Sequence, residues 1–233
     1  MSILHKGKEM VQLNCWHCQK KTETRSFCEH CGKVQPVSLD EDYFSFLGFP
    51  RLLSINPQDL EKAFHELSRR FHPDFFHGSI DNEKKLSLEN SVFLNKAYRT
   101  LKDPIERAEY FLTLEGEPPS KNQKQPPADL FEEIFEIQEL IEDFRKSKDE
   151  PDSLDSALKE NLEKEKRDLE GRRGELEKEL VGLFQKWDLF HKGSLKEERI
   201  EEKKKIFKEI RDILYNRSYL NTVIRDIGKA LET

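Results

Sequence analysis

Apolar side chains recur along most of this 233-residue chain at spacings of three and four residues, the pattern of amphipathic helices. The first long stripe follows Asn56 and Pro57, residue types that suit a helix cap and a first helical position. It consists of Leu60, Phe64, Leu67 and Phe71. The stripe predicts a helix that ends before Pro73, because proline disfavours helical backbone at the preceding residue.

Shorter helical patterns flank this helix. An apolar segment at residues 43–47 precedes it, a second long stripe covers about residues 82–102, and a short helix follows over residues 104–115. Two antiparallel helices bracketed by short ones predict one small helical bundle over residues 42–115.

The remaining chain predicts a second helical region. Residues 116–127 are polar and contain four prolines, which indicates a stiff linker. Helical patterns then cover about residues 128–147, 153–191 and 195–231, and the middle one has the leucine spacing of a coiled coil. Short connections between them predict an antiparallel three-helix bundle over residues 128–233. Because no strand pattern occurs outside the N-terminal segment, the expected fold class is all-α.

Composition excludes several functional classes. Only 35% of the residues are hydrophobic and 37% are charged, and no apolar run approaches the roughly 20 residues that span a bilayer. The net charge of −6 disfavours a dedicated nucleic-acid binder. No glycine-rich phosphate loop or G-x-S-x-G motif is present, so we expect no enzyme. Without a visible leader sequence, the bacterial cytoplasm is favoured, with a processed mitochondrial-matrix form as the alternative.

All four cysteines lie in one short window, as two C-x2-C pairs separated by nine residues: Cys15, Cys18, Cys28 and Cys31. Two such turns bring four thiolates to one tetrahedral metal ion, and zinc suits a closed four-sulfur site. One or two disulfides are the alternative, disfavoured in a reducing compartment. We therefore expect a structural zinc knuckle over residues 1–37, with His17 and His30 as bystanders. It could pack against the neighbouring helices, form a homodimer contact or bind a partner.

A helix with a basic outer face that ends in the tripeptide His72-Pro73-Asp74 resembles the J-domain of DnaK-type co-chaperones. The flanking stretches DYFSFLGFP and FLNKAYRTLKDPIERAEYFL, followed by a helical bundle, are similar to those of the HscB family. This family acts in iron–sulfur cluster biogenesis, and the resemblance covers about residues 42–233. The cysteine knuckle is similar to an N-terminal extension of the animal mitochondrial members.

The resemblance implies a J-protein co-chaperone with two protein partners. Its J-domain would stimulate the ATPase of a DnaK/HscA-type chaperone, and its C-terminal bundle would deliver an IscU-type scaffold protein. The tripeptide would trigger hydrolysis, and a basic helix face would meet an acidic chaperone surface. That face consists of Lys62, His65, Arg69 and Arg70.

The helix over residues 128–147 carries more apolar residues than its core face needs. Leu130, Ile134, Ile137, Ile141 and Phe144 already form a complete stripe. Phe131 and Phe135 lie beside this stripe next to acidic residues, which indicates a partner-binding patch. The alternative is that both rings pack beneath the J-domain.

The family resemblance assigns the same helix to the scaffold protein. The segment LFEEIFEIQELI resembles the family's scaffold-binding stretch, which places Phe131 and Phe135 at the apolar contacts. The acidic contacts would be Glu136, Glu139 and Asp143, and Tyr219 would add an aromatic ring from the last helix. The sequence departs from the family at Glu132, where relatives have an apolar residue.

Two other functions fit parts of the sequence. A zinc-knuckle adaptor that binds nucleic acid or another protein would use the helices as a spacer, but the acidic net charge disfavours it. A general J-protein that serves unfolded clients would share the tripeptide. It is disfavoured because no long segment rich in glycine and phenylalanine is present.

Overall fold

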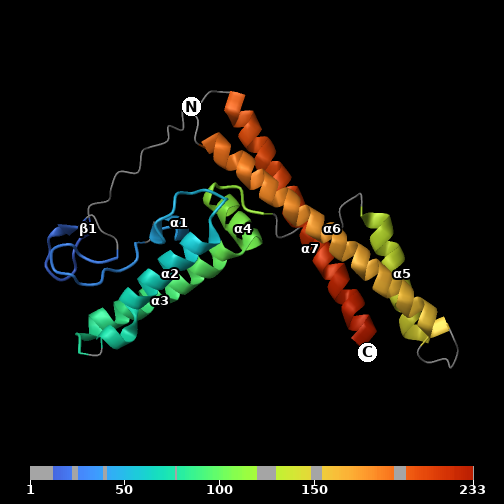
Figure 1. Cartoon of the computed structure of the whole chain (residues 1–233), viewed down its shortest axis with the longest axis horizontal. Helices are drawn as coiled ribbons and strands as arrows, with labels where there is room; N and C mark the ends of the chain where they lie inside the picture. The colour runs from blue at the N-terminus through green and yellow to red at the C-terminus, as the bar shows by residue number, and fades with distance from the viewer. Residues whose placement is uncertain are drawn as a thin grey trace. The chain divides into compact units, whose positions relative to one another are not determined.

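The computed structural model describes residues 13–22, 26–38, 41–76, 78–119, 130–147, 154–191 and 198–232. Figure 1 shows their elements in chain order, which are β1 (Leu13–Asn14), β2 (Lys21–Thr22), α1 (Tyr43–Phe46), α2 (Pro57–Phe71), the single 3₁₀ turn η1 (Pro73–Phe76), α3 (Asp81–Lys102), α4 (Pro104–Leu114), α5 (Phe131–Ser147), α6 (Leu154–His191) and α7 (Glu198–Glu232). The predicted all-α fold with a small N-terminal cysteine knuckle is confirmed. No helix in the described part of the chain is long and apolar enough to cross a membrane.

The chain divides into two compact units. Unit 1 comprises Met1–Arg51 and Ile55–Arg107, and unit 2 comprises Leu52–Ser54 and Ala108–Thr233. The expected bundle over residues 42–115 is therefore divided within α4. Most of the expected linker, residues 120–127, lies outside the described residues.

Unit 1 is built on an antiparallel hairpin of α2 and α3 (Figure 1). As the sequence predicted, Pro57 begins α2, and the side-chain oxygen of Asn56 accepts hydrogen bonds from the first-turn amides of Gln58 and Asp59. These bonds satisfy donors that have no partner inside the helix. The buried apolar residues of α1, α2 and α3 include Phe44, Leu60, Phe71, Leu94, Ala97 and Leu101.

A buried carboxylate fixes the start of unit 1's helical part. Asp42 caps α1 by accepting a hydrogen bond from the amide of Ser45 at 2.9 Å. Its other oxygen accepts two hydrogen bonds from the guanidinium of Arg51, at 3.0 and 2.7 Å. Burial raises the pKa of Asp42, but the Ser45 amide and the Arg51 guanidinium outweigh burial, so the pKa lies below its usual value.

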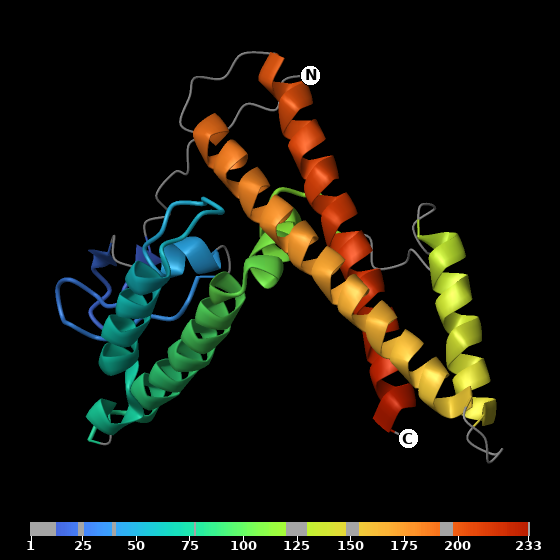
Figure 2. The same cartoon turned by 45° about the vertical axis from the view of Figure 1, so that its right-hand side comes forward.

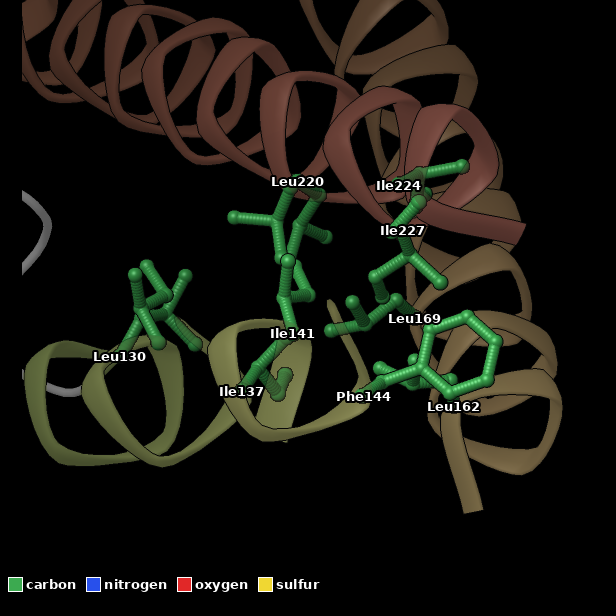
Figure 3. Close-up of a cluster of buried hydrophobic side chains, with 12 residues drawn as sticks. Leu130, Ile137, Ile141, Phe144, Leu162, Leu169, Leu220, Ile224 and Ile227 are labelled. Atoms are coloured by element: carbon green, nitrogen blue, oxygen red, sulfur yellow. The ribbon is translucent and has the colours of Figure 1, made fainter. Parts of the chain in front are cut away.

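Unit 2 is built on the long antiparallel hairpin of α6 and α7, which Figure 2 shows clearly. Helix α5 packs against one half of this hairpin. Its core stripe is buried as the spacing predicted, and it meets Leu162 and Leu169 of α6 and Leu220, Ile224 and Ile227 of α7 (Figure 3). The mixed aliphatic cluster closes this half of the bundle.

Aromatic rings fill the other half of the hairpin. The rings of Phe111, Trp187 and Phe207 lie 5.0–5.9 Å apart between centroids. Next to them, the buried Asp188 carboxylate accepts hydrogen bonds from the amides of Leu53 and Ser54 at 2.8 and 2.7 Å. One side chain of α6 thus holds a segment that lies far away in the sequence.

Replacing Asp42 with asparagine should destabilise unit 1 by about 1.5–3 kcal/mol near pH 7, because hydrogen bonds to an ionised group are lost. The wild-type advantage exists above the unfolded-state pKa of about 3.9 and disappears as the pH falls through the lowered folded-state pKa. Urea unfolding followed by NMR signals of α3 at several pH values would measure this difference. The exposed control Glu66→Gln should stay within about 0.5 kcal/mol of wild type. A deficit in Asp42→Asn that did not shrink as the pH fell below the unfolded-state pKa would contradict the prediction.

Candidate functional site

The four cysteines lie on two equivalent turns. In the first turn, the amide of Gln19 donates to the carbonyl of Cys15 at 3.0 Å, and in the second turn Gly32 donates to Cys28 at 2.8 Å. Gln19 and Gly32 both have a positive φ, 59° and 71°, so both turns use the left-handed region. Because glycine adopts a positive φ readily, the sequence indicated this conformation at Gly32 but not at Gln19. Both pairs share the pattern C-x-H-C-x-K, and this repeat was the signal that Gln19 occupies the same place in its turn as Gly32.

The four thiols converge on one point. All four sulfur atoms lie within 4.8 Å of one another, and two pairs, Cys15 with Cys31 and Cys18 with Cys28, are 3.7 Å apart. A disulfide needs about 2.05 Å, so these sulfurs are not bonded to each other. A tetrahedral ion with metal–sulfur bonds of 2.3 Å would separate its sulfurs by about 3.8 Å. The cluster therefore fits one metal ion held by four thiolates.

The acidities of the thiols agree with a cation site. Burial raises the pKa of Cys15, but hydrogen bonds from the Cys18 and His17 amides and from neighbouring thiols bring it down to about 6. The Lys33 amide lowers the pKa of Cys31, but burial and the other three sulfurs raise it to about 12. The Cys15 thiolate therefore forms readily, whereas the Cys31 thiolate needs a positive charge among the sulfurs.

The described residues of the knuckle are packed on the α2–α3 hairpin within unit 1. The Phe27 ring stacks on Phe71 of α2, with centroids 5.1 Å apart. Lys33 forms a 2.7 Å ion pair with the buried Glu83 of α3. Of the three roles left open by the sequence, packing against neighbouring helices is the one for which the described contacts provide direct evidence.

The tripeptide His72-Pro73-Asp74 follows α2 directly and is held between two buried phenylalanines, Phe71 and Phe76. The side chains of His72 and Asp74 are 52% and 70% exposed. The amide of Asp74 donates to Nδ1 of His72 at 3.3 Å, and a carboxylate oxygen of Asp74 lies 3.5 Å from the same nitrogen. Both polar side chains are thus available to a partner while the backbone on either side is anchored.

Three of the four predicted basic residues of α2 lie on one exposed face. Lys62, His65 and Arg69 fall within about 60° of arc at 100° per residue. Arg70 lies on another side of the helix, where its guanidinium carbon is 4.1 Å from the centre of the Phe27 ring. The structure therefore brings Arg70 to the knuckle, as a cation–π partner, rather than into the cluster of the other three.

The predicted scaffold-binding residues of α5 all lie on its exposed side. Phe131 and Phe135 are 56% and 55% exposed. At 100° per residue, they share an arc of about 140° with Glu136, Glu139 and Asp143. Glu139 is nearest to the phenylalanine pair, whereas Glu136 and Asp143 lie at the far end of the arc, as helical geometry predicted.

A cleft of about 660 Å³ adjoins the other edge of this phenylalanine pair. It lies in unit 2, where Ile134 and Gln138 of α5 and Tyr215 and Tyr219 of α7 contribute to its lining. The two tyrosine rings are 5.7 Å apart, and burial, then the neighbouring Tyr219, raises the pKa of Tyr215. Acidic residues around the cleft are Glu109, Asp212 and Asp226. Tyr219 is half-buried and packs against the α5–α6–α7 core.

Comparisons with known proteins identify the family. A family model described as "DnaJ domain" matches residues 42–110. A co-chaperone protein HscB homolog of Chromobacterium violaceum is 34% identical over 121 residues, which cover 52% of this chain and 69% of that protein. The chain belongs to the HscB co-chaperone family. This family is one of co-chaperones and not of enzymes, as the sequence predicted.

Two further HscB relatives extend the match. The iron–sulfur cluster co-chaperone protein HscB of Mus musculus is 34% identical over 142 residues, 59% of this chain and 60% of that protein. The crystal structure of human co-chaperone protein HscB has a TM-score of 0.66 at 26% identity and covers 93% of this chain and 98% of that chain. In sequence, the chain spans 50–60% of the length of the mouse, Arabidopsis and human relatives.

Sequence reasoning missed a polar stripe on α3 that joins the knuckle to the tripeptide. The buried residues of this stripe are Glu83, Ser87 and Asn90. Glu83 binds Lys33, Ser87 donates to the carbonyl of Phe71 at 2.7 Å, and Asn90 donates to the carbonyl of Gln35 at 2.9 Å. Polar residues at helical spacing on the same side as Leu86 and Ala97 were the available signal.

One metal ion per chain is expected. Cys15→Ser should lose it, whereas a His17→Ala, His30→Ala variant should keep it, because four thiolates complete the coordination. Metal analysis by mass spectrometry would measure the stoichiometry. Retention of metal by the Cys15→Ser variant at wild-type affinity would contradict the assignment of the ligands.

Removing that ion with a chelator should unfold the segment ahead of Asp42 and leave the helices formed, because a knuckle of this size has too little core to fold alone. Trp16 reports the knuckle, since its indole donates to the carbonyl of Val34 at 2.6 Å. The NMR signal of the Trp16 indole and far-ultraviolet circular dichroism would follow the two parts. Loss of all helicity on chelation would show that the knuckle is not a separate folding segment.

Proposed function

We propose that this HscB-family protein is a J-domain co-chaperone that stimulates ATP hydrolysis by a DnaK/HscA-type chaperone and delivers an IscU-type iron–sulfur scaffold protein to it. The observation that carries the proposal is the exposure of the His72 and Asp74 side chains of the tripeptide, which is anchored between buried Phe71 and Phe76. The exposed Asp74 carboxylate suits a charge-assisted bond to a chaperone arginine. The names of the mouse and human relatives, iron–sulfur cluster co-chaperone protein HscB, support the same pathway.

The basic residues of α2 support an acidic partner for this surface. Lys62 and Arg69 are exposed on the helix that ends at the tripeptide, and clustered charge of one sign steers an oppositely charged partner. His65 lies between them in the sequence, and the Glu61 carboxylate, 3.8 Å from its Nε2, adds one negative charge next to this face. Arg70 contributes indirectly, through its contact with Phe27.

Zinc is the ion we propose for the knuckle, with Cys15, Cys18, Cys28 and Cys31 as its ligands. A closed shell of four thiolates is typical of structural zinc sites and leaves no coordination position for a substrate. The bound ion would neutralise the crowded thiolates and hold the two turns together.

The phenylalanine pair of α5 supports a scaffold-binding site. Exposed aromatic rings on a protein surface are typical of a partner-binding site, and the adjoining cleft offers room for an apolar side chain beside Tyr215 and Tyr219. Acidic residues border both the rings and the cleft. We infer that the scaffold offers an apolar segment flanked by lysine or arginine.

The Asp74→Asn variant should lose ATPase stimulation by roughly tenfold or more, because the charge-assisted bond to the chaperone is removed. Single-turnover ATP hydrolysis by the chaperone, with and without the scaffold, measures this loss. Scaffold affinity should stay at the wild-type value, and the exposed control Asp81→Asn should stimulate normally. Stimulation by wild type without any synergy from the scaffold would indicate a general J-protein. Absence of stimulation by the wild type would overturn the proposal and favour an adaptor.

The double variant Phe131→Ala, Phe135→Ala should bind the scaffold about 30- to 1000-fold more weakly, which corresponds to about 2–4 kcal/mol for two anchor residues. Calorimetric titration measures the affinity, and the ATPase stimulation seen without scaffold should be unchanged. Leu189→Ala is the matched control, because Leu189 is 74% exposed on α6 of the same unit. Normal scaffold binding by the double variant would show that the patch lies elsewhere.

A further inference from the structure

The side chain of Phe71, directly before the tripeptide, is held between two other rings. It is fully buried, and its ring is nearly parallel to those of Phe27, at 5.1 Å and 12°, and Phe46, at 6.0 Å and 15°. Phe27 belongs to the knuckle and Phe46 to α1. The end of α2 is therefore a junction of three separate segments of unit 1.

The backbone of Phe71 is held as well. Its carbonyl accepts hydrogen bonds from the hydroxyls of Ser87 at 2.7 Å and Ser91 at 3.1 Å. The last carbonyls of a helix lack partners within the helix, and Pro73 has no amide hydrogen with which to close the turn. Two serines one turn apart on α3 provide the missing donors.

The knuckle cannot shift without breaking buried interactions. Lys33 pairs with Glu83 at 2.7 Å, and the side-chain amide of Asn90 donates to the carbonyl of Gln35 at 2.9 Å. These contacts fix the knuckle to α3, and they therefore fix Phe27 against Phe71. Arg70 adds a cation–π contact to the same ring.

We propose that Ser87, Ser91 and Phe27 are positioning residues for chaperone stimulation, acting through Phe71 on the placement of His72 and Asp74. This inference rests on the proposed function. The two trigger side chains are exposed, and the contacts between these two residues are local: the Asp74 amide lies 3.3 Å and the Asp74 carboxylate 3.5 Å from Nδ1 of His72. Their location therefore depends on the anchored backbone before and after them. A trigger displaced by about 1 Å can lose much of its effect on a bound partner.

The test compares three variants in single-turnover ATP hydrolysis. They are Ser91→Ala, the double variant Ser87→Ala, Ser91→Ala, and Phe27→Ala. We expect maximal stimulation to fall about fivefold or more in the double variant and in Phe27→Ala. Ser91→Thr should restore the loss caused by Ser91→Ala, because it keeps the hydroxyl. The NMR signal of the Asp74 amide should shift or broaden in the impaired variants. Thr113→Ala is the control, since it removes a 2.8 Å hydroxyl-to-carbonyl bond elsewhere.

Additional readouts separate the outcomes. Scaffold affinity, metal content and the folded fraction at the assay temperature should match wild type in every variant. Folded variants with wild-type maximal stimulation would overturn the inference, and so would a loss fully explained by the unfolded fraction. If the double variant does not fold, Ser91→Ala and its threonine rescue decide the question, because Ser91 is only half-buried. Absence of stimulation by the wild type would instead overturn the proposed function.

Discussion

Close packing of aromatic rings is central to each compact unit of this chain, because apolar residues are scarce overall. Only 35% of the residues are hydrophobic, yet 16 are phenylalanine. One aromatic side chain buries about 150–250 Å², so a few of them can replace a larger aliphatic core. In unit 1 the rings of Phe27 and Phe46 stack on Phe71. In unit 2 the rings of Phe111 and Phe207 contact Trp187 at steeper angles. Rings meet with defined spacing and tilt, which gives these small cores a specific geometry.

Where rings do not suffice, paired polar groups and thiolates complete the packing. Asp42, Glu83 and Asp188 are buried, and each meets a guanidinium, an ammonium or backbone amides. Such groups add stability only while their partners remain, since an unpaired buried charge is costly. In the knuckle, polar groups replace apolar packing to the greatest extent, because its centre is a cluster of four cysteines and not a hydrophobic core. Its packing contribution to unit 1, mainly Phe27, therefore depends on the cysteine cluster being held together.

Local patterns in the sequence predicted what local forces determine. The stripe of α5 is buried as its spacing required, Asn56 caps α2, and the cysteine pairs converge. Contacts between distant segments could not be inferred in this way. Asp188 accepts a hydrogen bond from the amide of Leu53, 135 positions earlier in the sequence. Arg70, predicted to belong to the basic face of α2, instead contacts the Phe27 ring of the knuckle. In both cases the residue type suited several roles, and only the tertiary neighbours select one.

In the proposed function, the tripeptide must satisfy two opposing demands, exposure to a partner and a fixed position. Exposed polar side chains gain little from the protein around them, so His72 and Asp74 cannot fix themselves. The chain meets both demands by burying the flanking residues: Phe71 and Phe76 lose nearly all exposure, while His72 and Asp74 remain exposed. The same tripeptide at the end of a helix without these buried phenylalanines would have side chains that are not held in a fixed position. The competence of the motif therefore resides in its buried neighbours as much as in its own side chains.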